Sequence, residues 1–118
     1  MKALAAWFCV AAIYPAAAVA QTRLITAVPA PDSAAGTAPY EVLLTFDQAV
    51  DPTQSTIAVT AGGGDSETSG PVHTEARFPA RLGVPLKPLQ PGKYRVDWST
   101  VGEDGRKSAG SFMFSVTQ

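Results

Sequence analysis

The sequence predicts an all-β protein with the architecture of an antiparallel Greek-key β-sandwich. Several short segments alternate between apolar and polar residues, which is the pattern of strands with one buried face. Turn-forming Gly, Pro and Asp residues separate these segments, and no helix-period segment of useful length follows residue 20. The chain that remains, about 100 residues, is long enough for the core of one sandwich and too short for a second domain.

Residues 1–20 have the features of a cleaved secretory signal. Lys2 is followed by an apolar stretch and then by the small residues Ala-Val-Ala, which fit a signal sequence and its cleavage site. The apolar stretch is short for a membrane span. Cleavage would leave a mature domain of residues 21–118 that begins at Gln21, and it would remove Cys9, the only cysteine. The secreted domain is therefore expected to have no disulfide bond and no thiolate metal site.

The first part of the mature domain predicts several strands in order. Pro29 ends the first of them because proline has no N–H to donate to a neighbouring strand. Two segments, 33–39 and 61–70, are rich in small and polar residues and are expected to be loops. The strands are expected at residues 23–28, 40–47, 56–60 and 72–78, with a further short strand at 82–86.

Residues 92–116 predict the last two strands, joined by a polar loop at residues 101–110. Tyr94, Val96 and Trp98 alternate with polar residues in the first strand. Phe112, Phe114 and Val116 alternate with Ser111, Met113 and Ser115 in the second, so each strand is expected to have one buried face. Tyr94 follows a Pro-Gly bend, which is the pattern of a tyrosine corner in Greek-key sandwiches. The side chains expected in the core are those of Tyr40, Val42, Leu44, Phe46, Phe78, Tyr94, Val96, Trp98, Phe112, Phe114 and Val116.

The same motifs, taken in order, carry a family resemblance. The segments GKYRVDW, DGR and GSFMFSV lie at the end of the chain, and QTRL with a later proline lies at the start of the mature domain. This order resembles the CopC family of periplasmic copper-resistance proteins. That family opens with His-x-x-Leu and closes with Gly-x-Tyr-x-Val-x-Trp, an Asp-x-His loop and Gly-x-x-x-Phe-x-Val. The resemblance covers nearly the whole mature chain and implies an Ig-like or cupredoxin-like sandwich in the periplasm.

The resemblance also implies a Cu(II) site made by an N-terminal histidine and by the aspartate and histidine of the loop. Imidazole nitrogen suits Cu(II) in a tetragonal plane. Carried over to this sequence, the aspartate is Asp104, the N-terminal position is Gln21 and the loop histidine is replaced by Arg106. Arginine is permanently cationic and cannot ligate a metal. Cu(II) is therefore expected to bind with low affinity, at Asp104 and weakly at the mature N-terminus of Gln21.

His73 is the only histidine in the chain and does not fall on a ligand position of the family. It shares the polar face of residues 72–78 with Glu75 and Arg77. One interpretation is a solvated surface residue, and the other is a weak alternative metal site with Glu75, since one imidazole alone makes a weak site. A Cu(I) site of the kind some relatives build from methionines is not expected, because residues 61–70 contain no methionine.

The sequence favours a binding protein over an enzyme. Glu103 and Asp104 lie beside Arg106 and Lys107 in a charge-balanced loop with no apolar surroundings to shift a pKa. Gln21 also removes the N-terminal histidine that copper monooxygenases use. With a net charge of −1 and no basic stripe, nucleic acid is not an expected partner.

Two functions remain open at this stage. In the first, the protein takes part in copper binding, homeostasis or resistance and passes copper to or near a membrane transporter of the CopD type. In the second, it is a CopC-fold, Ig-like interaction module that has lost metal binding and contacts a membrane protein through the Arg106-Lys107 loop and free sheet edges. A monomer is expected in both cases.

Overall fold

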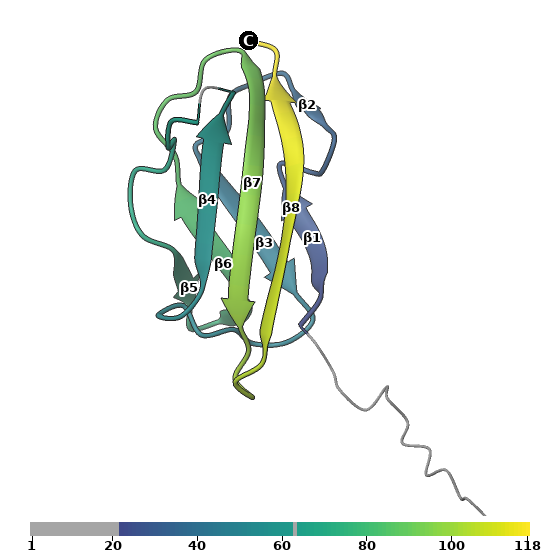
Figure 1. The fold of residues 1–118 in the computed structure, drawn as a ribbon, viewed down its shortest axis with the longest axis vertical. Helices are drawn as coiled ribbons and strands as arrows, with labels where there is room; N and C mark the ends of the chain where they lie inside the picture. The colour runs from purple at the N-terminus through teal and green to yellow at the C-terminus, as the bar shows by residue number, and fades with distance from the viewer. Residues whose placement is uncertain (1–21, 63) are drawn as a thin grey trace, which may run out of the picture.

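The computed structural model describes residues 22–62 and 64–118, and within these ranges the chain forms two packed sheets (Figure 1). The first sheet has the strand order β1-β3-β6-β5 and the second β2-β8-β7-β4. The expected signal sequence lies outside the described residues, and among those described no helix could span a membrane. The strands are β1 (Leu24–Val28), β2 (Ala34–Ala35), β3 (Glu41–Phe46), β4 (Thr56–Ala61), β5 (His73–Glu75), β6 (Phe78–Pro85), β7 (Gly92–Val101) and β8 (Lys107–Val116).

The chain passes repeatedly from one sheet to the other, which confirms the predicted β-sandwich. Neighbouring strands pair antiparallel except for β2, which pairs in parallel with the end of β8. The prediction of a loop at residues 33–39 was therefore wrong at Ala34 and Ala35. The Ser115 N–H donates to the Ser33 carbonyl and the Thr117 N–H to the Ala35 carbonyl, both at 2.9 Å, so this short segment is held at the edge of the second sheet.

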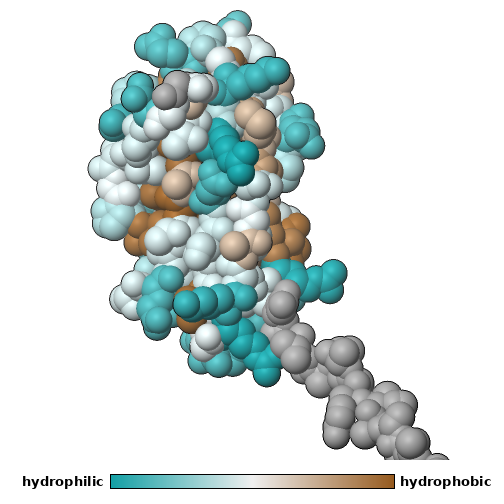
Figure 2. All heavy atoms as spheres, viewed as in Figure 1, coloured by the Kyte–Doolittle hydropathy of each residue, from teal (hydrophilic) through white to brown (hydrophobic). Residues whose placement is uncertain are grey.

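The core lies between the sheets and is built mainly from the inward positions of β3 and β6 in one sheet and of β4, β7 and β8 in the other. Phe46 and Trp98 meet edge to face with ring centroids 5.2 Å apart, and Tyr94 stacks on Phe114 at 5.4 Å. The Tyr94 hydroxyl donates to the Gln90 carbonyl, which confirms the predicted tyrosine corner. The outer face of the second sheet is largely hydrophilic (Figure 2), as the alternation of β7 and β8 predicts.

Two residues expected in the core are on the surface instead. Tyr40 is 80% exposed because β3 begins only at Glu41, and Phe78 is 44% exposed. The reason for Phe78 is that residues 72–78 do not form one strand. The chain turns between Glu75 and Phe78, which pair across a hairpin, and Phe78 begins the next strand. The guanidinium carbon of Arg81 lies 4.2 Å from the centre of the Phe78 ring and partly covers it.

The strand ends also differ from the sequence prediction. β6 extends from Phe78 to Pro85, where only a short strand at residues 82–86 was expected. β7 and β8 pair as far as Val101 and Lys107, so the polar loop expected at residues 101–110 is shortened to a tight turn at residues 102–106. The predicted core member Phe112 is half-buried and packs against the core.

The buried face of β8 should dominate the stability of the sandwich. Phe114 is 2% exposed and its neighbour Met113 is 45% exposed on the opposite face. We expect Phe114→Ala to lower the free energy of unfolding by about 3–5 kcal/mol, since it leaves a cavity in the core. Met113→Ala is the matched control and should change it by no more than about 0.5 kcal/mol. Urea denaturation of both variants measures this, and equal losses would contradict the assigned register.

Candidate functional site

The turn between β7 and β8 presents Asp104 at one end of the sandwich. The Gly102 N–H donates to the Arg106 carbonyl and the Gly105 N–H to the Gly102 carbonyl, both at 2.9 Å. Gly105 has a φ of 84°, in the left-handed region that glycine adopts most easily. The turn is also joined to the connection between β3 and β4, because the Glu103 N–H donates to the Ala49 carbonyl at 3.3 Å. Asp104 is therefore carried by a well-fixed turn.

Asp104 is engaged by Arg106 in two ways. Its Oδ1 accepts the backbone N–H of Arg106 at 3.0 Å, and its Oδ2 lies 3.7 Å from the Arg106 Nε. Both side chains are about two-fifths exposed, so this ion pair is solvated and contributes little to stability, about 0–1 kcal/mol. Arg106 thus acts as the counter-ion of Asp104.

The N-terminal segment reaches the same turn. Thr22 Oγ1 and Asp104 Oδ1 each lie 3.0 Å from the point that a Cβ on Gly102 would occupy, and the side-chain amide carbon of Gln48 lies 3.6 Å from it. Gln21 itself lies outside the described residues. Thr22, the first of the described residues, therefore lies near the same glycine as Asp104.

This cluster contains residues that the sequence interpretation missed. Thr22 is buried, with 3% of its surface exposed, and it lies two residues before the half-buried Leu24. Thr22 could have been found from the sequence, because it is a polar residue that takes an inward position in the alternation of the first strand. Gln48 and Gly102 carry no such signal, because only the tertiary pairing of Val50 with Gly102 brings their segments together.

The connection between β3 and β4 supports the turn through Asp51. The Asp51 carboxylate accepts hydrogen bonds from the Thr53 hydroxyl at 2.7 Å, the Thr53 N–H at 2.8 Å and the Gln54 side-chain amide at 2.9 Å. These donors, led by the Thr53 hydroxyl, lower the pKa of Asp51 from its usual value of 3.8. The Asp51 N–H donates to the Val101 carbonyl at 2.8 Å, so this connection is joined to the end of β7.

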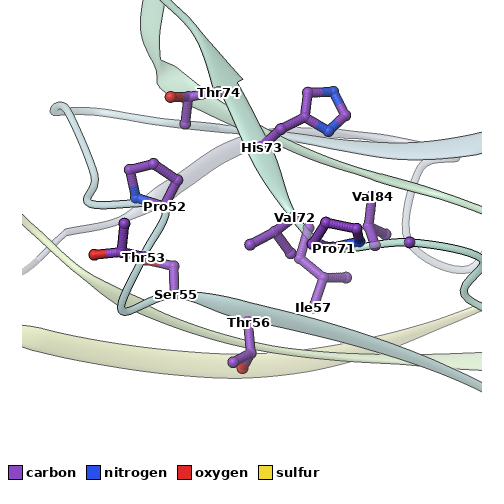
Figure 3. Close-up of a pocket in the computed structure, with 11 residues that line it drawn as sticks. Pro52, Thr53, Ser55, Thr56, Ile57, Pro71, Val72, His73, Thr74 and Val84 are labelled. Carbon is purple, nitrogen blue, oxygen red and sulfur yellow. The ribbon is translucent and has the colours of Figure 1, made fainter.

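His73 is placed away from this turn, on β5 in the other sheet. Its ring lies over Gly83, with Cε1 and Nε2 each 3.3 Å from the point that a Cβ there would occupy. It stands at the rim of an open groove of about 700 Å³, and Figure 3 shows its ring directed away from Val72 and Ile57. Residues 22–62 and 64–118 contain no group of three or more His, Cys, Asp or Glu side chains arranged to hold a metal ion.

The lowered pKa of Asp51 predicts a stability change in acid. The pKa of Asp51 is lower in the folded than in the unfolded protein. The ionised carboxylate therefore stabilises the fold above pH 3.8, and this stabilisation is lost as the pH falls through the folded pKa. We expect Asp51→Asn to have a lower free energy of unfolding than the parent at pH 7. As the pH falls below 3.8, the free energy of unfolding of this variant should decrease less than that of the parent. Thermal unfolding measured across this range tests it. Asp65→Asn, at an exposed loop position, is the control and should follow the parent.

Comparison with known proteins agrees with this architecture. Residues 24–117 match the CopC domain family. Protein YobA of Escherichia coli (strain K12) is 32% identical over 98 residues, which cover 82% of this chain and 79% of that protein. The crystal structure of CopC from Methylosinus trichosporium OB3b has a TM-score of 0.77 and 25% identity, covering 82% of this chain and 94% of that one.

A second solved structure is similar over an equal length. PcoC, a methionine-rich copper resistance protein from Escherichia coli, has a TM-score of 0.72 and 28% identity, and the match covers 83% of this chain and all of that one. The family match spans nearly all of the described sandwich, including β1, the strand pair β7–β8 and the turn that carries Asp104. This chain therefore belongs to the CopC domain family.

Proposed function

We propose that this protein is a secreted, periplasmic copper-handling protein of the CopC family whose Cu(II) site is weak and is formed by Asp104 and the mature N-terminus. The observation that supports this proposal is the contact above Gly102. Thr22 and Asp104 approach the same point there, and we propose that the mature N-terminus at the residue before Thr22 also lies beside the turn. The solved relatives include a copper resistance protein. The cleavage after Ala20 and the domain boundary at Gln21 are part of the proposal.

The donor atoms near Asp104 suit weak binding rather than a tight tetragonal site. The described residues around Gly102 offer a carboxylate, a hydroxyl and a side-chain amide, and they offer no imidazole. Cu(II) is held best by imidazole nitrogen, and Arg106 already compensates the charge of Asp104. A copper ion that binds Asp104 must therefore displace the Arg106 guanidinium, which further lowers its affinity.

Weak binding at an exposed turn is compatible with transfer rather than storage. Glu103 and Asp104 are both exposed at the end of the sandwich, where a partner could reach the bound ion. We propose that the ion is passed to or near a membrane transporter of the CopD type by a monomer. The protein then acts as a carrier and not as an enzyme, and copper is its cargo.

The second candidate is an interaction module that has lost copper altogether. The observation that favours it is the ion pair itself, because Arg106 supplies a positive charge to Asp104 from within the same turn. In that case the turn and the open sheet edges would contact a protein partner directly. Titration of the correctly processed protein with Cu(II) and Cu(I) separates the two candidates, since the carrier binds weakly and the module does not bind.

Restoring the two family histidines should create a tight site. We expect Gln21→His combined with Arg106→His to bind Cu(II) more tightly than the parent by about two orders of magnitude or more, because two imidazoles complete the tetragonal plane. Competitive Cu(II) titration gives the affinity, and electron paramagnetic resonance gives the ligand set. Mass spectrometry must first show that the exported protein begins at residue 21.

The single variants serve as controls for this experiment. Gln21→His alone and Arg106→His alone should each gain much less affinity than the double variant, since each leaves the plane incomplete. Tight, nitrogen-rich binding by the unmodified protein would contradict the proposed weak site. A double variant that does not bind would show that the N-terminus and the turn do not meet.

His73 should not contribute to this site. It lies on β5 in the other sheet from Asp104, and its side chain is exposed. We expect His73→Ala to leave the copper affinity of the parent and of the double variant unchanged and to alter stability by no more than about 0.5 kcal/mol. Titration of both backgrounds tests this. A large loss of binding would favour the alternative site at His73 and Glu75.

A further inference from the structure

The strand β8 has a long free edge. On that side its neighbour in the second sheet is β2, which pairs only with Ser115 and Val116 at the C-terminal end of β8 (Figure 1). Just before β2, the Asp32 N–H donates to the Met113 carbonyl at 2.7 Å. Residues 107–112 of β8 have no neighbouring strand on this side among the residues that the structure describes. A free edge of this length presents a row of backbone groups to which another chain can pair.

The pairing register shows which backbone groups of β8 point to this edge. β7 and β8 pair without interruption over their whole length. The Met113 carbonyl and the Ser115 N–H both face the side of β2. Backbone groups alternate in direction along an antiparallel strand, so those of Lys107, Ala109 and Ser111 face the same side. Their N–H and C=O groups have no backbone partner within residues 22–62 and 64–118.

This part of β8 lacks the features that usually protect a free edge. Residues 107–112 contain no proline and no register shift, and the side chains at residues 108–111 are small. The other edge strands are better protected. β1 has a register shift near its start, β5 has only three residues, and β4 is covered at Val59, whose carbonyl accepts the Glu67 N–H at 2.8 Å.

An open groove of about 490 Å³ lies beside the free edge, between the two sheets. Leu24 of β1, Trp98 of β7 and Phe112 of β8 contribute apolar side chains to it. The charges at its ends differ in sign. Lys107 is exposed where the edge begins, and the exposed Asp32 lines the groove near the end at which β2 begins. The edge therefore combines free backbone groups, an apolar groove and two opposite charges.

We propose that this edge is a docking site for an extended segment of a partner protein, which adds to the second sheet as a strand antiparallel to β8. The segment pairs with the free backbone groups of Lys107, Ala109 and Ser111 and places an apolar side chain in the groove. Antiparallel pairing is the more stable arrangement per residue. This inference goes beyond the proposed function and does not depend on copper binding.

Charge complementarity defines the partner segment further. An acidic residue fits opposite Lys107 and a basic residue fits near Asp32. Because the segment runs antiparallel to β8, its basic residue comes before its acidic residue in the sequence. The probe is therefore a synthetic peptide of about ten residues, with alternating threonine and valine, a lysine near its amino end and a glutamate near its carboxyl end.

Two measurements follow binding of this peptide to the exported protein. Trp98 is the only tryptophan in residues 21–118 and lines the groove, so we expect its fluorescence emission to shift. In the free protein, the amides of Lys107, Ala109 and Ser111 should exchange their hydrogens faster than those of the alternate residues, which face β7. With the peptide bound, exchange at these three amides should slow by about tenfold or more.

Matched peptides separate strand pairing from contact by side chains alone. Methyl groups on the backbone nitrogens of one alternating set of residues face β8 and should abolish binding. The same number of methyl groups on the other set faces away and should leave the affinity nearly unchanged. Lys107→Glu should weaken binding of the probe by about three- to fivefold and strengthen binding of a peptide whose two charges are exchanged.

A pair of variants at Ser111 tests the edge from the side of the protein. Ser111→Pro removes an N–H that faces the free edge and leaves the hydrogen bonds to β7 in place, so the domain should fold and lose peptide binding. Ser111→Ala keeps the N–H and should bind as the parent does.

Three outcomes would overturn the inference. The first is a probe that does not bind, and the second is binding that responds equally to the two sets of methyl groups. The third is self-association of the protein in sedimentation experiments that Ser111→Pro abolishes, because a second copy would then cover the edge. None of these outcomes changes the copper titrations, so the proposed function is tested separately.

Discussion

The contact between Phe46 and Trp98 joins the two sheets at the centre of this sandwich. It joins β3 of one sheet to β7 of the other, with ring centroids 5.2 Å apart. Gly110 makes room for the indole, since a Cβ there would lie 2.6 Å from the Trp98 ring. Leu24 of β1 pairs with Phe46 of β3, so β1 is positioned beside the same contact. Thr22, two residues before Leu24, lies close to Gly102 in the turn that follows β7.

The turn between β7 and β8 holds a carboxylate and its counter-ion together. Asp104 Oδ1 and Thr22 Oγ1 both lie near Gly102, and Arg106 supplies a positive charge from within the same turn. An internal cation of this kind is always present at high local concentration, whereas a metal ion must compete for the carboxylate. Because the ion pair is solvated and weak, the competition is open to a divalent ion that finds a second ligand. The identity of that second ligand then determines the affinity.

The sequence was sufficient for the parts of the fold that depend on local alternation. β3, β7 and β8 follow a period of two, and their inward residues are buried except at Phe112, which is half-buried. Phe78 could not be placed in this way, because the hairpin turn before it resets the alternation, and alternation alone does not show where a strand is interrupted. For the candidate site, the motif predicted Asp104, and its role there stays a prediction. Thr22 and Gln48 depend on tertiary pairing between three segments and were not predicted.

The two functions that family membership leaves open differ in what becomes of the ion pair at this turn. In an interaction module, the pair of Asp104 and Arg106 is the final state. In a carrier, a cation would compete with Arg106 for the carboxylate, and the ion pair, being solvated, would oppose that competition only weakly. The positive charge of Arg106, rather than the β-sandwich that both functions share, is therefore the feature on which the choice between them depends.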